Sequence, residues 1–337
     1  MSLLPYLHRA AAREDLSAED ARLAMNVLLD GAATPVEIAA FLTALRTKGE
    51  TALELAGFAR AMRAHMISVD AGVDLVDNCG TGGDGSGTFN ISTTAAFVMA
   101  GAGAIVAKHG NRSISSATGA ADVLEALGIR VTVSPQEAAS SLREIGIAFL
   151  FAPAFHPAIK HVQPVRRELK MRTVFNLLGP LANPARVQMQ VIGAPSVAAA
   201  GLIADALCEL TTKRVFVVHG HSGLDEISTT GPTDVFEVCA AKLKRHVWEP
   251  ADFGLQPAQL GALAGGDAEH NARIVRAILS GEQGAPREIV LANAAAGLVA
   301  AGLAENLLDG VRMAAESIDS GAARDKLSAL QSYLLKP

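Results

Sequence analysis

Residues 74–101 read DLVDNCGTGGDGSGTFNISTTAAFVMAG, which is the pattern of a strand, a glycine-rich loop and a helix. Asp74–Asn78 is a strand candidate, and Thr93–Gly101 is predicted to be helical. Five of the eight residues from 80 to 87 are glycines. Glycine adopts positive φ readily, so such a loop can bring backbone N–H groups against a ligand. A helix N-terminus adds unpaired donors and a partial positive charge, and the stretch therefore predicts a phosphate-binding loop.

A second stretch, residues 108–113, reads Lys-His-Gly-Asn-Arg-Ser and lies about fifteen residues further along the chain. Its lysine and arginine are the cations that a phosphate needs at close range. The two stretches together predict a phosphorylated, anionic substrate.

From about Val73 onward, short apolar runs alternate with helical stretches, which predicts a mostly parallel sheet covered by helices. The strand candidates are Asp74–Asn78, Ala104–Ala107, Ile129–Val133, Ile147–Phe151 and Arg214–Val218, and the helix candidates are Thr93–Gly101, Asp122–Leu127 and Pro135–Ile145. Ligands gather at the carboxyl ends of such strands. The glycine loop, Lys108 with His109, and the residues from His219 onward each follow a candidate strand. We expect these three segments to converge on one edge of the sheet.

The first 66 residues have the pattern of a small helical bundle. Ser17, Thr34 and Thr51 each stand three residues before a carboxylate, as helix N-caps do, and Gly31 and Gly49 stand where the first two helices should end. We expect this bundle to dock on a larger domain or on a second copy of the chain.

Length and composition limit the function. A chain of 337 residues is long for one core, so two domains are expected. A net charge of −5 and an aromatic content of 4% give neither a basic surface nor a stacking platform for nucleic acid. Three scattered cysteines, Cys79, Cys208 and Cys239, are expected to be reduced thiols of a cytoplasmic protein. The sequence shows no signal peptide and no membrane-spanning run.

The spacing Gly80-x-Gly82-x-x-Gly85 also matches the dinucleotide-binding fingerprint. That fingerprint expects a carboxylate about 20 residues further on, where this chain has Lys108. A nicotinamide-dependent oxidoreductase is therefore disfavoured. Asp84 would repel a bare diphosphate, but it suits ribose hydroxyls or a metal ion.

Two further features carry a functional and a plain interpretation. Asp225 and Glu226 are adjacent acids in a glycine-containing loop, which suits an anchor for a magnesium ion (Mg²⁺) or a solvated surface. Arg166 lies in a basic stretch that forms either a solvated helix face or a guanidinium fork for a carboxylate.

Several long motifs, in the same order, resemble the anthranilate phosphoribosyltransferase family. They are residues 80–84, 90–93, 108–113, 166–169, 176–184 and 223–226. The resemblance runs nearly end to end, and it implies a nucleoside phosphorylase class II type fold. This fold has a helical domain at residues 1–66, through which a homodimer forms, and an α/β phosphoribosyltransferase domain at residues 73–330. The implied reaction joins anthranilate to 5-phospho-α-D-ribose 1-diphosphate, with Mg²⁺ required, in the second step of tryptophan biosynthesis.

The resemblance also implies the roles of individual residues. Lys108 and Asp84 would be catalytic, and Ser92, Asp225 and Glu226 would bind Mg²⁺. Anthranilate would meet Gly80, His109, Asn111, Arg166, Gly179 and Pro180. The phosphoribosyl donor would meet Gly80, Gly82, Gly83, Asp84, Thr88, Asn90, Ile91, Ser92, Thr93, Lys108, His109, Gly110, Asn111, Arg112, Ser113, Ile114, Ser115, Ser116 and Ala120.

Two related classes of protein stay as alternatives. A pyrimidine-nucleoside phosphorylase shares the implied fold, but it carries Lys-His-Ser before the glycines, where this chain has residues 77–79, Asp-Asn-Cys. A non-catalytic homologue that binds nucleic acid should have lost the acidic pair that is present here as Asp225 and Glu226. Cys79 and Ala120 depart from the residues usual in the family, and neither departure touches the acidic pair.

Overall fold

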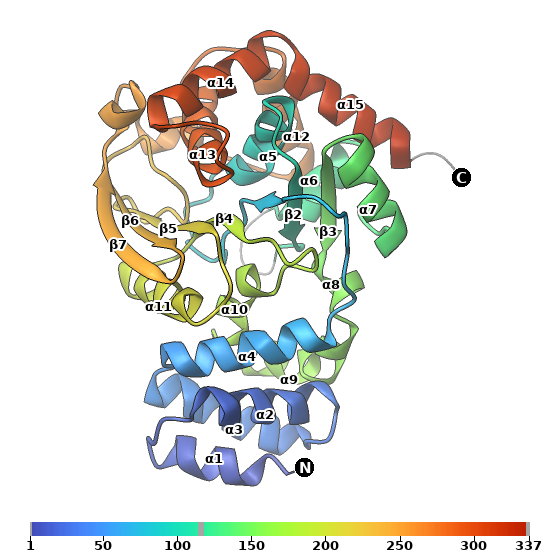
Figure 1. Ribbon diagram of the computed structural model, residues 1–337, viewed down its shortest axis with the longest axis vertical. Helices are drawn as coiled ribbons and strands as arrows, with labels where there is room; N and C mark the ends of the chain where they lie inside the picture. The colour runs from blue at the N-terminus through green and yellow to red at the C-terminus, as the bar shows by residue number, and fades with distance from the viewer. Residues whose placement is uncertain (1, 114–117, 335–337) are drawn as a thin grey trace.

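The computed structural model describes residues 2–113 and 118–334 of the chain. Three residues expected to contact the donor, Ile114, Ser115 and Ser116, lie outside the described residues. Helices α1–α4 form one end of the molecule, and a twisted sheet with helices on both faces forms the rest (Figure 1). No helix in the described ranges is long and apolar enough to cross a membrane.

The N-terminal end forms helices where the capping residues predict them. Its helices are α1 (Leu4–Ala11), α2 (Ala18–Leu29), α3 (Pro35–Lys48) and α4 (Ala52–His65). The Ser17 side chain accepts a hydrogen bond from the Asp20 N–H, while Thr34 and Thr51 form complete capping boxes with carboxylates three residues on. Gly31 and Gly49, at the ends of α2 and α3, have φ of 70° and 90°. These conformations are the ones that glycine tolerates best, so the predicted helix ends are confirmed.

The described residues form a seven-stranded sheet in the order β3-β2-β1-β4-β5-β6-β7. Its strands are β1 (Val76–Asp77), β2 (Val106–Gly110), β3 (Ile147–Phe151), β4 (Met189–Gly193), β5 (Arg214–Gly220), β6 (Thr233–Cys239) and β7 (Lys242–Trp248). Strands β1 to β5 pair in parallel, and β6 and β7 add an antiparallel edge. The predicted fold class, a small helical domain plus a larger α/β domain with a mostly parallel sheet, is confirmed.

The helices that follow the strands cover both faces of the sheet (Figure 1). They are α5 (Ile91–Gly101), α6 (Ala120–Ala126), α7 (Pro135–Glu144), α8 (Ala152–Phe155), α9 (Gln163–Leu169), α10 (Phe175–Leu178), α11 (Val197–Cys208), α12 (Ala268–Leu279), α13 (Ala285–Ala300), α14 (Leu307–Asp319) and α15 (Ala322–Leu334). Four short 3-10 helices complete the described elements: η1 (Pro157–His161), η2 (Pro180–Ala182), η3 (Pro250–Phe253) and η4 (Leu260–Leu263).

One predicted strand is wrong. Residues 129–133 form no strand, although Ile129, Val131 and Val133 are buried and the residues between them are exposed. The alternation is real, but it reflects an extended link between α6 and α7 that packs its odd residues into the core. No strand of the described sheet pairs with this link, so it lacks the hydrogen-bonded ladder that defines a strand.

Two separate cores hold the elements together. One packs α5, α6, α7 and α12–α15 against one face of the sheet. The other joins α1–α4 to α9, α10 and η2, and continues through α11 to the opposite face of the sheet. Residues 162–182 therefore belong to the packing of the helical end, although they follow β3 in the chain. A segment of the α/β domain therefore packs against the N-terminal bundle.

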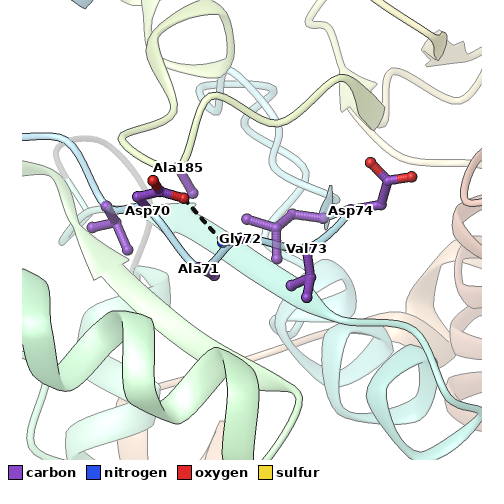
Figure 2. Close-up of a pocket in the computed structure, with 8 residues that line it drawn as sticks. Asp70, Ala71, Gly72, Val73, Asp74 and Ala185 are labelled. Carbon is purple, nitrogen blue, oxygen red and sulfur yellow. Dashed lines mark hydrogen bonds between the residues drawn. The ribbon is translucent and has the colours of Figure 1, made fainter.

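A linker connects the helical end to β1. Its residues 69–75 line a hollow of about 460 Å³ together with Ala185 (Figure 2). Within it, the Asp70 carboxylate accepts a hydrogen bond of 2.9 Å from the Gly72 N–H. None of the residues that we expected to bind a substrate or a metal ion lines this hollow.

Candidate active site

The three segments predicted to converge at the carboxyl ends of the strands do so. The Gly82 N–H donates to Asp225 Oδ2 over 2.9 Å, which joins the loop after β1 to the loop after β5. The Ser92 N–H, in the first turn of α5, donates to Glu226 Oε1 over 3.1 Å. Lys108, on β2 beside β1, donates from Nζ to the Asn78 carbonyl over 3.1 Å. One constellation thus contains a glycine loop, a helix N-terminus, a lysine and two acids.

The glycine loop uses the conformational freedom for which glycine was expected. Gly82, Gly83, Gly85 and Gly87 have φ between 67° and 77°. Side chains rarely adopt such angles, so the four positions favour glycine independently of any ligand.

The acidic cluster is electrostatically strained in the absence of a cation. Burial, and next the charge of Asp84, raise the pKa of Asp225 to about 7. Burial and the charge of Asp225 raise the pKa of Glu226 to about 8, against the opposing charge of Lys108. A bound cation would offset these costs, because opposite charge stabilises the ionised carboxylates.

The oxygen atoms available here suit Mg²⁺, which takes some of its ligands from substrate or water, better than they suit a metal ion that is held by protein side chains alone. Among the described residues, no group of three or more His, Cys, Asp or Glu side chains is arranged to hold a metal ion. Asp225, Glu226 and the Ser92 hydroxyl offer oxygen ligands only, and further oxygens would have to come from a ligand or water. Mg²⁺ is commonly bound in this way, through one or two carboxylates plus substrate phosphates.

Lys108 is buried and held by Asn78. Its ammonium group donates to the Asn78 carbonyl and, over 3.2 Å, to Asn78 Oδ1, which occupies two of its three hydrogens. The Asn78 Nδ2 in turn donates to the Ser92 carbonyl over 2.7 Å. Asn78 therefore orients both the lysine and the start of α5, a role that no motif in the sequence indicated.

A second pair of polar residues, Asp77 and Asn183, was given no role from the sequence, although Asn183 lies within the motif at residues 176–184. Asp77 is fully buried in β1, where its Oδ1 accepts from the His109 N–H over 3.2 Å. Its Oδ2 accepts from Asn183 Nδ2 over 2.8 Å, and Asn183 also donates to the Ala107 carbonyl over 2.8 Å. Burial raises the pKa of Asp77, while Lys108 acts against this rise. An acid inside an apolar strand was the available signal, because a buried carboxylate needs several partners.

Arg166 lies on α9, apart from the acidic cluster. Its Nη1 donates to Gln163 Oε1 over 3.2 Å, and its guanidinium lies 5.0 Å from the centre of the Phe175 ring. Burial lowers its pKa, and no carboxylate among the described residues pairs with it. A half-buried arginine without an acid suits capture of a carboxylate from a ligand.

Two histidines stand between these regions. The rings of His109 and His156 are 5.2 Å apart, and both Nε2 atoms are buried without a hydrogen-bond partner among the described residues. His109 Nδ1 lies 3.0 Å from the Gly179 carbonyl, so Nδ1 carries the proton and Nε2 is an acceptor. Burial lowers the pKa of His109 to about 3 and that of His156 to about 4, which keeps both rings neutral. No role was predicted for His156, because nothing local in the sequence marks it.

Some residues expected to contact the donor are engaged elsewhere. Arg112 pairs with Asp122 over 2.9 Å and Glu125 over 2.6 Å, which ties its loop to α6. The Asn90 amide donates to the Thr118 carbonyl, in the loop before α6, and accepts from Asn271 of helix α12. Asn111 Oδ1 accepts from the Arg112 N–H over 2.7 Å. The roles of these side chains toward a substrate stay predictions.

The other expected residues lie on the same elements. Gly80 and Thr88 belong to the glycine loop, Ile91 and Thr93 to the first turn of α5, Gly110 to the end of β2, Ser113 to the following loop and Ala120 to the first position of α6. Gly179 and Pro180 lie at the junction of α10 and η2.

Comparison with known proteins decides what this arrangement is related to. Residues 72–324 match the model of the glycosyl transferase family a/b domain, and residues 4–66 match that of its helical bundle domain. Anthranilate phosphoribosyltransferase of Solibacter usitatus is 56% identical over 336 residues, which cover 99% of each chain. This chain belongs to the anthranilate phosphoribosyltransferase family.

Solved structures of the family share the whole fold. The anthranilate phosphoribosyltransferase of Thermus thermophilus matches with a TM-score of 0.92 and 42% identity, over 97% of this chain and 98% of that one. The Saccharomyces cerevisiae enzyme in complex with PRPP and Mg matches with a TM-score of 0.89 and 32% identity, over 98% and 97% of the two chains. The resemblance found in the motifs is thus confirmed over the full length.

Proposed function

We propose that this chain transfers the 5-phosphoribosyl group of 5-phospho-α-D-ribose 1-diphosphate to anthranilate. The products are N-(5-phosphoribosyl)anthranilate and diphosphate, in the second step of tryptophan biosynthesis. The observation that carries the proposal is the single site in which the glycine loop, Lys108 and the Asp225–Glu226 pair meet. Membership of the anthranilate phosphoribosyltransferase family supports the identity of both substrates.

The donor binds where the chain offers N–H groups and positive charge. The glycine loop presents backbone donors to the phosphates, and the third hydrogen of the Lys108 ammonium is available to the diphosphate. Asp84, whose Oδ1 accepts from the Ser86 N–H over 3.2 Å, meets the ribose in this proposal. Asp225, Glu226 and Ser92 hold Mg²⁺. When bound, this ion neutralises charge that builds up on the departing diphosphate.

The acceptor binds on the side of α9 and η2. Arg166 forms charge-assisted hydrogen bonds with the carboxylate of anthranilate. The neutral His109 offers its Nε2 as an acceptor to the amino hydrogens, and the unpartnered Nε2 of His156 belongs to the neighbouring ring. The aromatic amine of anthranilate is uncharged at neutral pH, so its lone pair is available to attack the sugar.

The reaction needs no covalent intermediate with the protein. The nitrogen of anthranilate forms a bond to C1 of the ribose as the bond from C1 to the diphosphate oxygen breaks, and the nitrogen then loses a proton. The chain contributes by holding both substrates in line and by placing Lys108 beside the leaving group. Orientation of this kind supplies several kcal/mol of barrier reduction, and a preorganised charge adds to it.

The test is the fluorescence of anthranilate over time with purified protein, the donor and Mg²⁺. We expect a decay that needs all three additions and stops when a chelator is added. A flat trace from folded protein, together with phosphorolysis of pyrimidine nucleosides, would replace the proposal with the nucleoside phosphorylase alternative.

The homodimer and the cytoplasmic location expected from the sequence belong to the same proposal. Light scattering behind a sizing column measures the mass of the assembly against the 34.8 kDa of one chain. A mass of one chain at micromolar concentration would remove the dimer from the proposal.

A further inference from the structure

Arg172 connects the acceptor side of the molecule to the glycine loop. It lies between α9 and α10, and its Nη1 donates to the carbonyls of Gly82 and Gly83 over 3.2 and 3.0 Å. Its Nη2 donates to the Gly82 carbonyl over 3.2 Å. A single guanidinium fork therefore holds two successive carbonyls of the loop.

The orientation of these carbonyls fixes the orientation of two N–H groups. The described peptide bonds are all trans, so each carbonyl points away from the N–H of the residue that follows it. The N–H groups of Gly83 and Asp84 consequently face away from Arg172. The hydrogen bonds of the described residues include no acceptor for either of them, whereas the preceding N–H, of Gly82, is bound by Asp225.

Glycine by itself does not fix this arrangement. Its backbone reaches many conformations at similar energy, so the loop can rotate these peptides unless something holds them. The planar guanidinium, with five donors in a rigid fork, is suited to hold two carbonyls at once. The approach is so close that a Cβ at Gly83 would overlap Arg172 Nη1.

We propose that Arg172 is a positioning residue for the anion site. It holds the Gly82 and Gly83 carbonyls so that the N–H groups of Gly83 and Asp84 are directed at the diphosphate before the ligand arrives. The choice of diphosphate rests on the proposed function. Arg172 itself touches the loop backbone and not the reacting atoms, so its effect is preorganisation of the binding groups.

The experiment compares Arg172→Ala, Arg172→Lys and Arg167→Ala. Arg167 is an exposed arginine five residues earlier and has no partner among the described hydrogen bonds and ion pairs, which makes it a matched control. Binding of inorganic diphosphate with Mg²⁺ is measured by calorimetry. We expect the dissociation constant to rise about tenfold for alanine, the equivalent of one charge-assisted interaction, and less for lysine. The Arg167→Ala variant should bind as the wild type does.

Hydrogen exchange of the ligand-free proteins separates positioning from direct contact. The Gly82 and Ser86 N–H groups are bound by Asp225 and Asp84, and they should exchange faster in Arg172→Ala if the loop loosens. Weaker diphosphate binding with unchanged exchange would mean that Arg172 contacts the anion itself, which overturns the proposal. Unchanged binding would overturn it as well. Steady-state kinetics should show a higher KM for the donor and an unchanged KM for anthranilate.

Failure of this inference is distinguishable from failure of the proposed function. Binding of diphosphate by the wild type can be measured without anthranilate. A protein that binds diphosphate through the positioned loop but leaves anthranilate unchanged would keep the role of Arg172 and remove the reaction.

Discussion

At the scale of single residues, Arg166 offers the sharpest test of substrate assignment. Replacing it with alanine removes a charge-assisted interaction worth about 1.5–3 kcal/mol, or roughly a 10- to 100-fold effect. We expect this effect in the KM for anthranilate, with a KM for the donor close to that of the wild type. The exposed Arg167→Ala variant is the control for a general loss of charge. Equal changes in both KM values would remove Arg166 from the acceptor site.

If Glu226 binds Mg²⁺ as proposed, its ionisation links metal binding to the stability of the fold. Its pKa in the folded protein is raised to about 8, and that of Asp225 to about 7, above the ordinary values of 4.5 and 3.8. Between about pH 4 and pH 8 the folded state therefore binds more protons than the unfolded state. Stability without metal should fall as the pH rises through this window.

Glu226→Gln removes the titration of Glu226, leaves that of Asp225, and keeps an oxygen for the Ser92 N–H. We expect the metal-free variant to melt above the wild type at pH 8, by roughly 1–2 °C for each 1 kcal/mol, and by less at pH 5. Saturating Mg²⁺ should raise the Tm of the wild type and leave that of the variant nearly unchanged. Thermal unfolding at the two pH values measures both effects. If the wild type were more stable than the variant at pH 8 without metal, ionised Glu226 would not destabilise the metal-free fold, and this prediction would be wrong.

The sequence predicts the residues that carry chemical groups better than the residues that orient them. Lys108, Asp225 and Arg166 stand in recognisable motifs, so they could be named without a structure. Asp77 and Asn183 act through contacts between segments 106 residues apart, and no local pattern reports such a distance. His156 becomes visible only because its ring lies beside His109 with an unpartnered nitrogen.

At the scale of elements, the signals differ between helices and strands. Helix starts were predictable because a cap is local: Thr34, Thr51 and Ser134 each bind the backbone three residues ahead. The β6–β7 hairpin was missed because its turn consists of Ala240 and Ala241, at φ of 47° and 61°. Hairpin turns with two positive φ angles normally contain Asn or Gly, which makes them recognisable in a sequence. Strand identity depends on pairing partners, which explains the error at residues 129–133.

Strand β4 supports the loop that we propose to bind Mg²⁺, through a glycine that no sequence motif marks. A Cβ at Gly193 would overlap the Asp225 carbonyl oxygen and lie 2.6 Å from its carbon. These are backbone atoms, so Gly193→Ala must displace the loop that carries Asp225 and Glu226. We expect the Mg²⁺ concentration that gives half of the maximal rate to rise at least tenfold, and the Tm to fall.

Gly201→Ala is the matched control for this prediction. Its Cβ would lie 3.5 Å from Phe236, an ordinary contact, within helix α11. Alanine favours a helix over glycine by about 1 kcal/mol, so this variant should be at least as stable as the wild type. Titration of the initial rate with Mg²⁺ compares the two. Identical metal dependence in Gly193→Ala would mean that β4 does not set the position of the acidic pair.

At the scale of the whole molecule, the candidate site lies where the two cores meet. The donor loops leave the sheet, while Arg166 and the Gly179–Pro180 turn lie on a segment packed against α3 and α4. The relative position of donor and acceptor thus depends on packing between the helical end and the sheet. The match to the helical bundle domain ends at residue 66, and the match to the a/b domain begins at residue 72. The second core nevertheless contains buried side chains from both sides of this boundary.

This shared core predicts cooperative unfolding of the whole chain. Leu178 of α10 is fully buried among side chains of the helical end, so Leu178→Ala should cost about 2–5 kcal/mol. Trp248 is the one tryptophan of the chain, lies on the edge strand β7 and packs against the other core. We expect its fluorescence and the helical circular dichroism to change at one Tm, and Leu178→Ala to lower both equally. Leu308→Ala, at a side chain 59% exposed on α14, should leave both nearly unchanged. If Leu178→Ala instead lowered only the helical signal and Trp248 kept its Tm, the helical end would be an independently folding unit, and the site would join two separable bodies.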